Sequence, residues 1–334
     1  MFEVSHSKIK TGRRCLNAYH KKYVRKLRKR VKSKSLTVGT LVHSCLESYF
    51  RNGYYLPEIQ KWKEQEYEKM FLEEQALHAD VIPLVKQLIR GYISHWKSLG
   101  LEMLWVEKEF RVEIAPDLIL VGKIDGRARD NRGMEWLVEH KTAKKMPGEE
   151  VRIFDTQVLL YAGVLPHLGE KPVNGVIWDY LRTKLPSKPK LLKNGGLSTA
   201  KIDTTKEVYL REIKRHGLDP AGYEDILADL EAKKDSFYRQ VKLPLSDTMG
   251  KTILEELIVT ARQLEELENQ DKQEGSTGRL FPRNLTRDCS WCDFASLCHA
   301  ELRGEDTEYL LKHDYVERKN DEKEFDLETS EASD

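Results

Sequence analysis

Residues 118–143 read LILVGKIDGRARDNRGMEWLVEHKTA, and this stretch determines the expected fold of the chain. Two runs with the apolar composition of buried strands flank residues 130–133, whose Asp-Asn-Arg-Gly sequence is typical of a tight turn. The pattern therefore predicts a β-hairpin. In that hairpin Asp125, at the end of the segment LILVGKID, comes close to Glu139 on the second strand.

The second strand carries an unusual combination of charges. Side chains alternate between the two faces of a strand, so Glu139 and Lys141 point to one side and His140 to the other. An acid and a lysine together on a buried strand need a reason, because isolated buried charge is costly. A simple salt bridge between Glu139 and Lys141 is one explanation of this pattern.

Catalysis with a metal ion is the other explanation. The converging carboxylates of Asp125 and Glu139 can hold one or two divalent ions, for which oxygen ligands are suitable. The main-chain carbonyl of His140 is a further candidate ligand. Such an ion polarises a phosphate and lowers the pKa of bound water. Lys141 would then orient that water, help to deprotonate it, and offset developing negative charge.

Three more polar residues stand near this pair in the order of the sequence. His43 lies in GTLVHSCLE, on a segment, 38–51, whose apolar spacing predicts a helix, and imidazole is a good ligand for divalent ions. Gln157 and Tyr161, in DTQVLLYAG, are one helical turn apart on a predicted helix after the strand. They could bind a phosphate or hold Lys141 in place, although each alone is equally typical of a packed core.

Composition and patterning suggest four regions in the 334 residues. They are an N-terminal helical region (1–100), a sheet core (101–185), a C-terminal helical region (186–305) and an acidic tail expected to be disordered (306–334). Within them, residues 5–30 and 221–240 are each predicted to form one helix. No apolar run reaches the roughly 20 residues of a membrane span, and the N-terminus has no secretory pattern, so the expected location is the cytoplasm without membrane association.

Basic residues are concentrated in two places although the net charge is only +1. More than half of residues 20–34 are Lys or Arg, and the loop at 184–193 is rich in Lys. Both segments could guide a nucleic-acid strand through its phosphates. For the first segment, a solvated helical face is an equally good explanation.

The cysteines indicate a second metal site. Three of the five cysteines, Cys289, Cys292 and Cys298, fall in RDCSWCDFASLCHA, and a cluster of this kind in a reducing compartment favours metal over disulfides. Thiolate sites usually have four ligands, so Cys15 and Cys45 compete for the fourth position. Cys45 has the pattern of a small buried hydrophobe. Spacing alone does not separate zinc from an iron–sulfur cluster.

The order of these motifs resembles a known family. GTLVH, GKID, EHK, QVLLY and CSWCDFASLC together are similar to the RecB-type branch of the PD-(D/E)XK nuclease superfamily over roughly residues 5–305. In particular they resemble the CRISPR-associated and phage-encoded exonucleases with an iron–sulfur cluster, and the AddB nuclease domain. The resemblance implies an α/β, restriction-endonuclease-like core with a central mixed β-sheet flanked by helices. It also implies N- and C-terminal helical regions that an iron–sulfur cluster joins.

The resemblance also implies roles for individual residues. Mg²⁺ or Mn²⁺ would be bound by His43, Asp125, Glu139 and the carbonyl of His140. Lys141 would be the catalytic lysine, and Gln157 and Tyr161 the motif that follows it. Cys15 matches the distant N-terminal cysteine of the family, so a 4Fe–4S cluster would be bound by Cys15, Cys289, Cys292 and Cys298. One departure is that Ile124-Asp125 stands where the superfamily has Pro-Asp, which is common in this branch.

The expected activity is hydrolysis of DNA by a metal-dependent exonuclease that prefers single-stranded ends. The expected polarity is 5′–3′, although the motifs do not determine it, and they do not determine the oligomeric state either. The setting would be phage or prokaryotic recombination, repair or CRISPR adaptation, with proteins of those systems as partners. The alternative is a non-catalytic nucleic-acid-binding scaffold subunit with a structural iron–sulfur or zinc site. The intact set of Asp125, Glu139 and Lys141 argues against that alternative.

Overall fold

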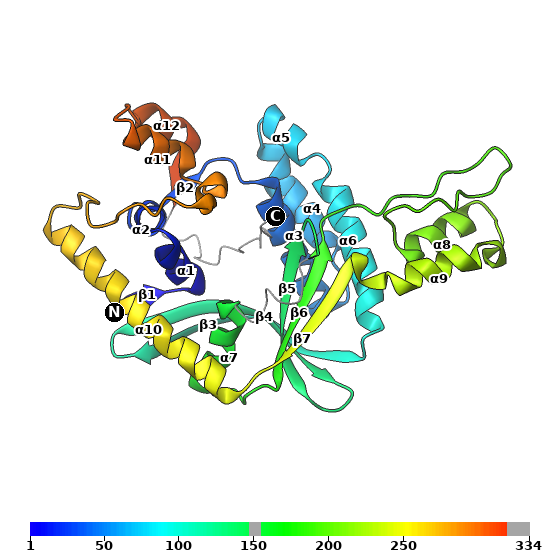
Figure 1. Ribbon diagram of the computed structural model, residues 1–334, viewed down its shortest axis with the longest axis horizontal. Helices are drawn as coiled ribbons and strands as arrows, with labels where there is room; N and C mark the ends of the chain where they lie inside the picture. Colours follow the sequence, from blue (N-terminus) through cyan, green and yellow to red (C-terminus); the bar gives the residue numbers. More distant parts are fainter. Residues whose placement is uncertain (147–154, 319–334) are drawn as a thin grey trace.

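A mixed β-sheet of six strands forms the centre of the molecule (Figure 1). The computed structural model describes residues 1–146 and 155–318. The strands follow the order β1-β4-β5-β6-β7, and β3 pairs with β4 beside this path. They are β1 (Phe2–Val4), β3 (Leu101–Ala115), β4 (Leu118–Asp130), β5 (Glu135–Ala143), β6 (Gly175–Arg182) and β7 (Tyr238–Pro244). The mixed-sheet prediction is confirmed, but the sheet takes two strands, β1 and β7, from outside residues 101–185.

The hairpin predicted from residues 118–143 is present, and its two strands separate at one end. β4 pairs with β5 only where residues 126–129 face residues 135–138. Beyond that point the earlier part of β4 pairs with β1 and β3, whereas β5 continues along β6. Figure 1 shows β3 and β4 turning away from β5, β6 and β7. The two strands therefore separate between Asp125 and Glu139. These residues lie next to the last paired positions, Gly126 and Val138.

Helices cover both faces of the sheet. One face packs against α3 (Lys34–Asn52), α4 (Leu56–Gln65) and α6 (Val81–Lys97), and the core there includes Trp136 and Val138 of β5. The other face packs against α7 (Thr156–Val164) and α10 (Asp247–Gln273), with Leu137 of β5 in that core. The alternation of β5 thus places His140 toward α3 and α6, and Glu139 and Lys141 toward α7. A short helix, α5 (Leu72–His78), lies between α4 and α6.

The segment between β6 and β7 forms a projecting arm (Figure 1). It contains α8 (Lys206–Arg215) and α9 (Glu224–Ala232), which share a small core of their own. The prediction of one helix over 221–240 was wrong, because the chain enters β7 at Tyr238 and pairs with β6. Tyr238 is buried, and its hydroxyl donates to the carbonyl of Leu88 on α6. Tertiary pairing here outweighs local helix propensity.

The N-terminal segment is also divided more finely than the sequence predicts. The helix expected over residues 5–30 ends at Arg14, the last residue of α1 (His6–Arg14), because Cys15 has an extended backbone. The chain continues as α2 (Leu16–Tyr19), a π-helix (His20–Val24) and β2 (Leu27–Lys29). The basic residues of 20–34 therefore lie on a π-helix, a short strand and the segment that leads into α3 rather than on one helical face, which corrects the predicted helix.

The C-terminal segment returns to this N-terminal segment. It contains a short helical turn (Arg287–Trp291), α11 (Ala295–Leu302), α12 (Glu308–Asp314) and β8 (Tyr315–Glu317), and β8 pairs with β2. Residues 308–317 were assigned from the sequence to a disordered tail, but they form α12 and β8, and Tyr315 is buried against Phe294. The remainder of that predicted tail, 319–334, lies outside the described residues. In the described part of the chain, no helix combines the length and apolar character of a bilayer span.

Candidate metal centre and active site

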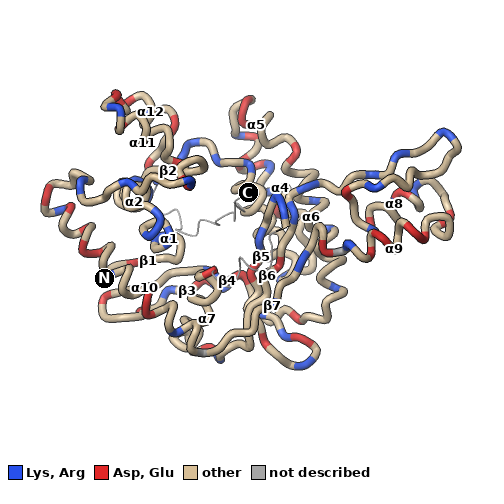
Figure 2. The backbone as a smooth tube through the Cα atoms, in the orientation of Figure 1, with Lys and Arg blue, Asp and Glu red and all other residues tan. Residues whose placement is uncertain are grey.

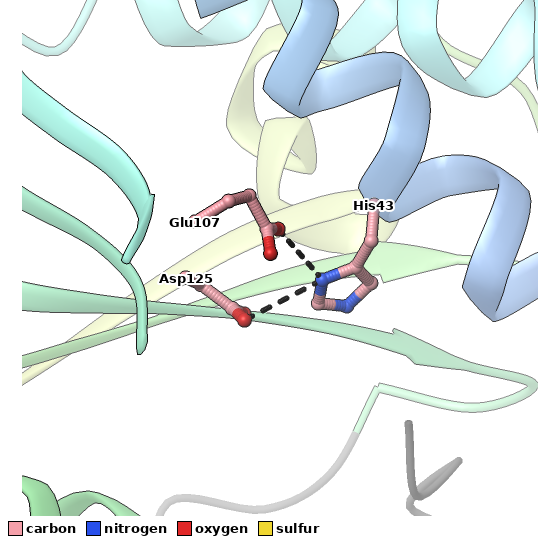
Figure 3. Close-up of side chains that lie close together, drawn as sticks. All are labelled: His43, Glu107 and Asp125. Atoms are coloured by element: carbon pink, nitrogen blue, oxygen red, sulfur yellow. Dashed lines mark ion pairs between the residues drawn. The ribbon is translucent and has the colours of Figure 1, made fainter. Parts of the chain in front are cut away.

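A histidine and two carboxylates from three separate elements meet where the sheet opens (Figure 3). Ligand atoms of His43 on α3, Glu107 on β3 and Asp125 on β4 all lie within 4.8 Å of one another. The Nδ1 atom of His43 is 3.4 Å from Oε1 of Glu107 and 3.5 Å from Oδ1 of Asp125. The structure thus unites two predicted metal ligands, His43 and Asp125, with a third acid that sequence reasoning missed.

Glu107 faces Asp125 across the ladder between β3 and β4. Val106 pairs with Gly126 and Lys108 pairs with Ile124, so the residue between them stands opposite Asp125. Glu107 has a φ of 49°, a left-handed conformation that is strained for a residue with a Cβ atom. Counting back from the turn after β3 would have paired Asp125 with Lys108 instead, because a β-bulge between Glu113 and Ala115 shifts the register by one residue.

Electrostatics couple these three side chains. Burial lowers the pKa of His43, but the facing carboxylates of Asp125 and Glu107 outweigh burial and raise it to about 10. Burial raises the pKa of Asp125, and the His43 cation outweighs that effect and lowers it to about 2. The proton on His43 therefore balances two adjacent carboxylates that would otherwise repel each other.

A divalent cation fits this arrangement. The buried Nδ1 atom of His43 forms no hydrogen bond within residues 1–146 and 155–318, although both acids lie close to it. Imidazole binds a metal only in its neutral form, so an ion at this point would replace the proton and neutralise both carboxylates. One histidine nitrogen and two carboxylate oxygens are a donor set suited to Mg²⁺ or Mn²⁺.

Glu139 and Lys141 form a second polar group on the α7 side of β5. The Nζ atom of Lys141 lies 2.7 Å from Oε1 of Glu139 and donates to Oε1 of Gln157 at 2.9 Å. Gln157 donates in turn to the hydroxyl of Tyr161 at 3.4 Å. Burial opposes the charge on Lys141, but the carboxylates of Glu139 and Asp155 outweigh burial and raise its pKa. Glu139, Lys141, Gln157 and Tyr161 therefore form one continuous series of polar contacts.

The two carboxylate oxygens of Glu139 have different surroundings, and Oε1 is the one that pairs with Lys141. Its Oε2 atom is buried and has no hydrogen-bond partner in the described part of the chain. Burial, followed by repulsion from Asp125, raises the pKa of Glu139 to about 8. Glu139 therefore interacts with Asp125 electrostatically but does not belong to the compact group of His43, Glu107 and Asp125. Its role as a metal ligand stays a prediction.

The peptide of His140 connects Asp125 to a buried hydrogen-bond network. The main-chain N–H of His140 donates to Oδ2 of Asp125 at 2.8 Å. The hydroxyl of Tyr92 on α6 donates to Oδ2 of Asp179 at 2.6 Å and lies 3.0 Å from Nε2 of His140. Because the hydroxyl gives its only proton to Asp179, Nε2 of His140 must be the donor to Tyr92. Burial lowers the pKa of His140 to about 4, which favours the neutral ring with its one proton on Nε2. Its predicted carbonyl contact with a metal stays a prediction.

Replacing Tyr92 with phenylalanine is expected to weaken binding of Mn²⁺ by about 10- to 100-fold, the range typical of residues that orient metal ligands. The variant frees the His140 ring and so loosens the peptide that holds Asp125. Tyr238→Phe is the matched control, since its buried hydroxyl donates to the carbonyl of Leu88 in the same layer. Titration with Mn²⁺, alongside thermal unfolding, compares the two. Equal loss of stability with unchanged metal affinity in both variants would show that Tyr92 is merely structural.

Three of the four predicted cluster cysteines contact Arg283 or Asn284. The backbone N–H of Asn284 donates to Sγ of Cys15 at 3.5 Å, and its carbonyl accepts from Sγ of Cys289 at 3.8 Å. Nε of Arg283 donates to Sγ of Cys298 at 3.2 Å. Burial raises the pKa of Cys292, and Cys15 is close enough to contribute in the same direction. The two ends of the chain thus place these thiols in one region beside cations that would stabilise thiolates. Within residues 1–146 and 155–318 the thiols do not form a compact ligand group like that of His43, Glu107 and Asp125, so the cluster stays a prediction.

Cys45 lies elsewhere. It is fully buried on α3 in the core of the other helical layer, and burial raises the pKa of its thiol to about 12. Such a thiol is a hydrophobic core group rather than a ligand.

Comparisons with known proteins add the following. No curated protein matches this sequence significantly. A solved structure described as the crystal structure of SSO0001 is similar at 15% sequence identity with a TM-score of 0.30, over 78% of this chain and 84% of that chain, a likeness too small to support an argument. The family model of the PD-(D/E)XK nuclease superfamily matches residues 3–299, which include every candidate site residue described above. This chain therefore belongs to the PD-(D/E)XK nuclease superfamily.

Proposed function

We propose that this protein is a metal-dependent DNA exonuclease that acts on single-stranded ends. The observation that carries the proposal is the convergence of His43, Glu107 and Asp125 at the opening of the sheet, in a chain of a nuclease superfamily. The pair of Glu139 and Lys141 lies directly across the same opening. A scaffold protein would gain nothing from burying so many charges at one point, since each is costly to desolvate.

The side chains have separate tasks in this proposal. A divalent ion bound there supplies charge that stabilises the phosphate and acidifies water. His43, Glu107, Asp125 and Glu139 provide its ligands. Lys141 orients the attacking water and offsets the negative charge that develops on the phosphate. Gln157 accepts a hydrogen bond from Lys141 and so fixes the position of its ammonium group.

We propose further that Cys15, Cys289, Cys292 and Cys298 bind a 4Fe–4S cluster, with zinc as the alternative. Support comes from the contacts of Cys15, Cys289 and Cys298 with Arg283 and Asn284, and from the electrostatic interaction between Cys292 and Cys15. The similarity of the motifs to the RecB-type branch favours iron and sulfur over zinc. The same similarity is the basis for proposing recombination, repair or CRISPR adaptation in a phage or prokaryote as the setting, with 5′–3′ polarity.

The decisive experiment uses protein purified without oxygen. Metal analysis and the visible spectrum identify the cluster, and digestion of end-labelled single and double strands with Mg²⁺ or Mn²⁺ measures activity and polarity. We expect release of nucleotides from single-stranded ends by the wild type, and none by Asp125→Asn or Glu107→Gln. A wild type that binds DNA without cleaving it under any of these conditions would favour the scaffold alternative. Colourless protein with zinc and no iron would overturn the iron–sulfur assignment.

A further inference from the structure

A groove runs between α1 and α10, from the first residue of α7 to Cys15. A cavity of about 70 Å³ at one end is lined by His6, Lys10 and Thr156, among others. A second cavity, of about 680 Å³, is lined by Arg14, Cys15 and Gln263, among others. Arg13 lines both cavities, so they adjoin along the same side of α1. The larger volume lies within the range of sites that bind ligands.

The two helices hold this groove in a defined shape. The guanidinium group of Arg13 donates to the carbonyl of Glu256 at 3.0 Å and to the hydroxyl of Thr260 at 2.8 Å, both on α10. A Cβ atom on Gly12 would meet the side chain of Leu264, so the close approach of the helices depends on this glycine. The groove is thus part of the packed structure and not a gap between independent helices.

The lining combines positive charge, amides and an apolar floor. Its cations are Lys10, Arg13, Arg14 and Arg283. Within residues 1–146 and 155–318, Glu266 is the one carboxylate that lines the two cavities. Figure 2 shows blue segments along α1 and red segments along α10. Three carboxamides and several aliphatic side chains complete the walls: Gln263, Gln270, Asn284, Leu16, Leu264, Leu267, Ile9, Leu160, Ile253 and Leu257.

These surfaces match the parts of a single nucleic-acid strand. Phosphates are attracted to the guanidinium and ammonium groups, whereas bases can lie on the apolar floor and bond to the carboxamides. At the Cys15 end, the guanidinium of Arg14 lies 4.6 Å from the ring centre of Trp291, which is 48% exposed and offers a face for stacking.

One end of the groove lies beside the element that carries Gln157 of the candidate active site. Thr156 lines the smaller cavity and is the first residue of α7. Its hydroxyl oxygen is hydrogen-bonded to Nε2 of His6 at 3.0 Å. Gln157, the next residue, accepts from Lys141. From His6 to Cys15 the groove follows α1 for about 14 Å, at the usual rise of 1.5 Å per residue. We propose that this groove binds the single strand of the nucleic-acid substrate next to the part being hydrolysed, which rests on the proposed nuclease function.

The test is a charge change inside the groove with a matched change outside it. Lys10→Glu combined with Gln263→Glu alters one residue in each cavity and touches no candidate ligand. Lys251→Glu combined with Gln273→Glu makes the same charge change at exposed positions of α10 outside the groove. Binding of labelled single strands of increasing length is measured in Ca²⁺ over a range of salt. For the groove variant we expect about tenfold weaker binding of long strands and a salt slope smaller by about 0.7, the value for one lost phosphate contact.

Crosslinking provides a second measurement on wild-type protein. Single strands containing 4-thiothymidine should crosslink to peptides of α1 and α10, with the attachment moving toward Cys15 as the label moves away from the cleaved end. Wild-type affinity in the groove variant, or crosslinks confined to other elements, overturns the groove while leaving the nuclease proposal intact. A wild type that neither binds nor cleaves single strands overturns both.

Discussion

Replacing Lys141 with methionine is expected to lower the rate of metal-dependent DNA hydrolysis about a thousandfold, the size of effect typical of losing a general acid–base or charge-stabilising group. Methionine keeps the volume of the side chain but removes the ammonium group that contacts Glu139 and Gln157. Because His43, Glu107 and Asp125 keep their positions, affinity for Mn²⁺ should be retained. Steady-state digestion of end-labelled single strands measures the rate of hydrolysis, and a separate titration measures the affinity for Mn²⁺.

Lys8→Met is the matched control for this variant. Lys8 is as buried as Lys141, with side chains 10% and 9% exposed, and it pairs with Glu268 at 3.3 Å outside the candidate site. Both variants lose a buried ion pair, which is destabilising because it leaves a carboxylate uncompensated. Only Lys141→Met should lose hydrolysis. The assignment of Lys141 is wrong if the folded variant retains activity within tenfold of the wild type.

Replacing Cys15 with alanine is expected to abolish binding of the cluster metal and to reduce the soluble yield sharply. A crosslink from Cys15 to the three C-terminal cysteines closes a loop that contains most of the chain, and constraints on such long loops stabilise by about 5 kcal/mol in the chain-entropy description. Metal that binds only the folded state adds further stability by linkage. Iron and zinc content, visible absorbance and thermal unfolding provide the measurements.

Cys45→Ala provides the comparison, because Cys45 was the other candidate for the fourth ligand. It removes a buried thiol that packs in the α3 layer, so it should cost only about 1–2 kcal/mol of stability, as small truncations in a core do. Metal content should be that of the wild type. The reverse result, full metal in Cys15→Ala and loss in Cys45→Ala, would assign the ligand to Cys45.

Local signals account for what the sequence predicted well. The turn at residues 130–133 and the period-two alternation of VEHKTA suffice to place Asp125 near Glu139 and to separate Glu139 and Lys141 from His140. The positions of Gln157 and Tyr161 follow from helical spacing on the next element. These relations depend on residues that are close in sequence, where geometry leaves little freedom.

Relations between distant segments account for what the sequence did not predict. Glu107 reaches His43 and Asp125 through a strained backbone conformation and a register that a β-bulge between Glu113 and Ala115 shifts by one residue. β1 and β7 join the sheet through pairing partners far along the chain, and nothing in their own short, mixed sequences requires it. The network from Tyr92 through His140 to Asp179 depends on how α6 packs over the sheet. Tertiary context decides each of these, as it usually does for short strands.

The return of the C-terminal segment to the N-terminal one has a consequence for the order of folding. β1 pairs with β4, the N–H of Asn17 donates to the carbonyl of Pro282, and β2 pairs with β8. During synthesis, the first thirty residues are thus released long before most of their partners exist. These residues cannot make their native contacts until the sheet and its helical layers have formed. Contacts of such high sequence separation form late and slowly. The closure of the two ends, which brings the cysteines together for the first time, is therefore expected to be the last step of folding and to determine when the cluster can be loaded.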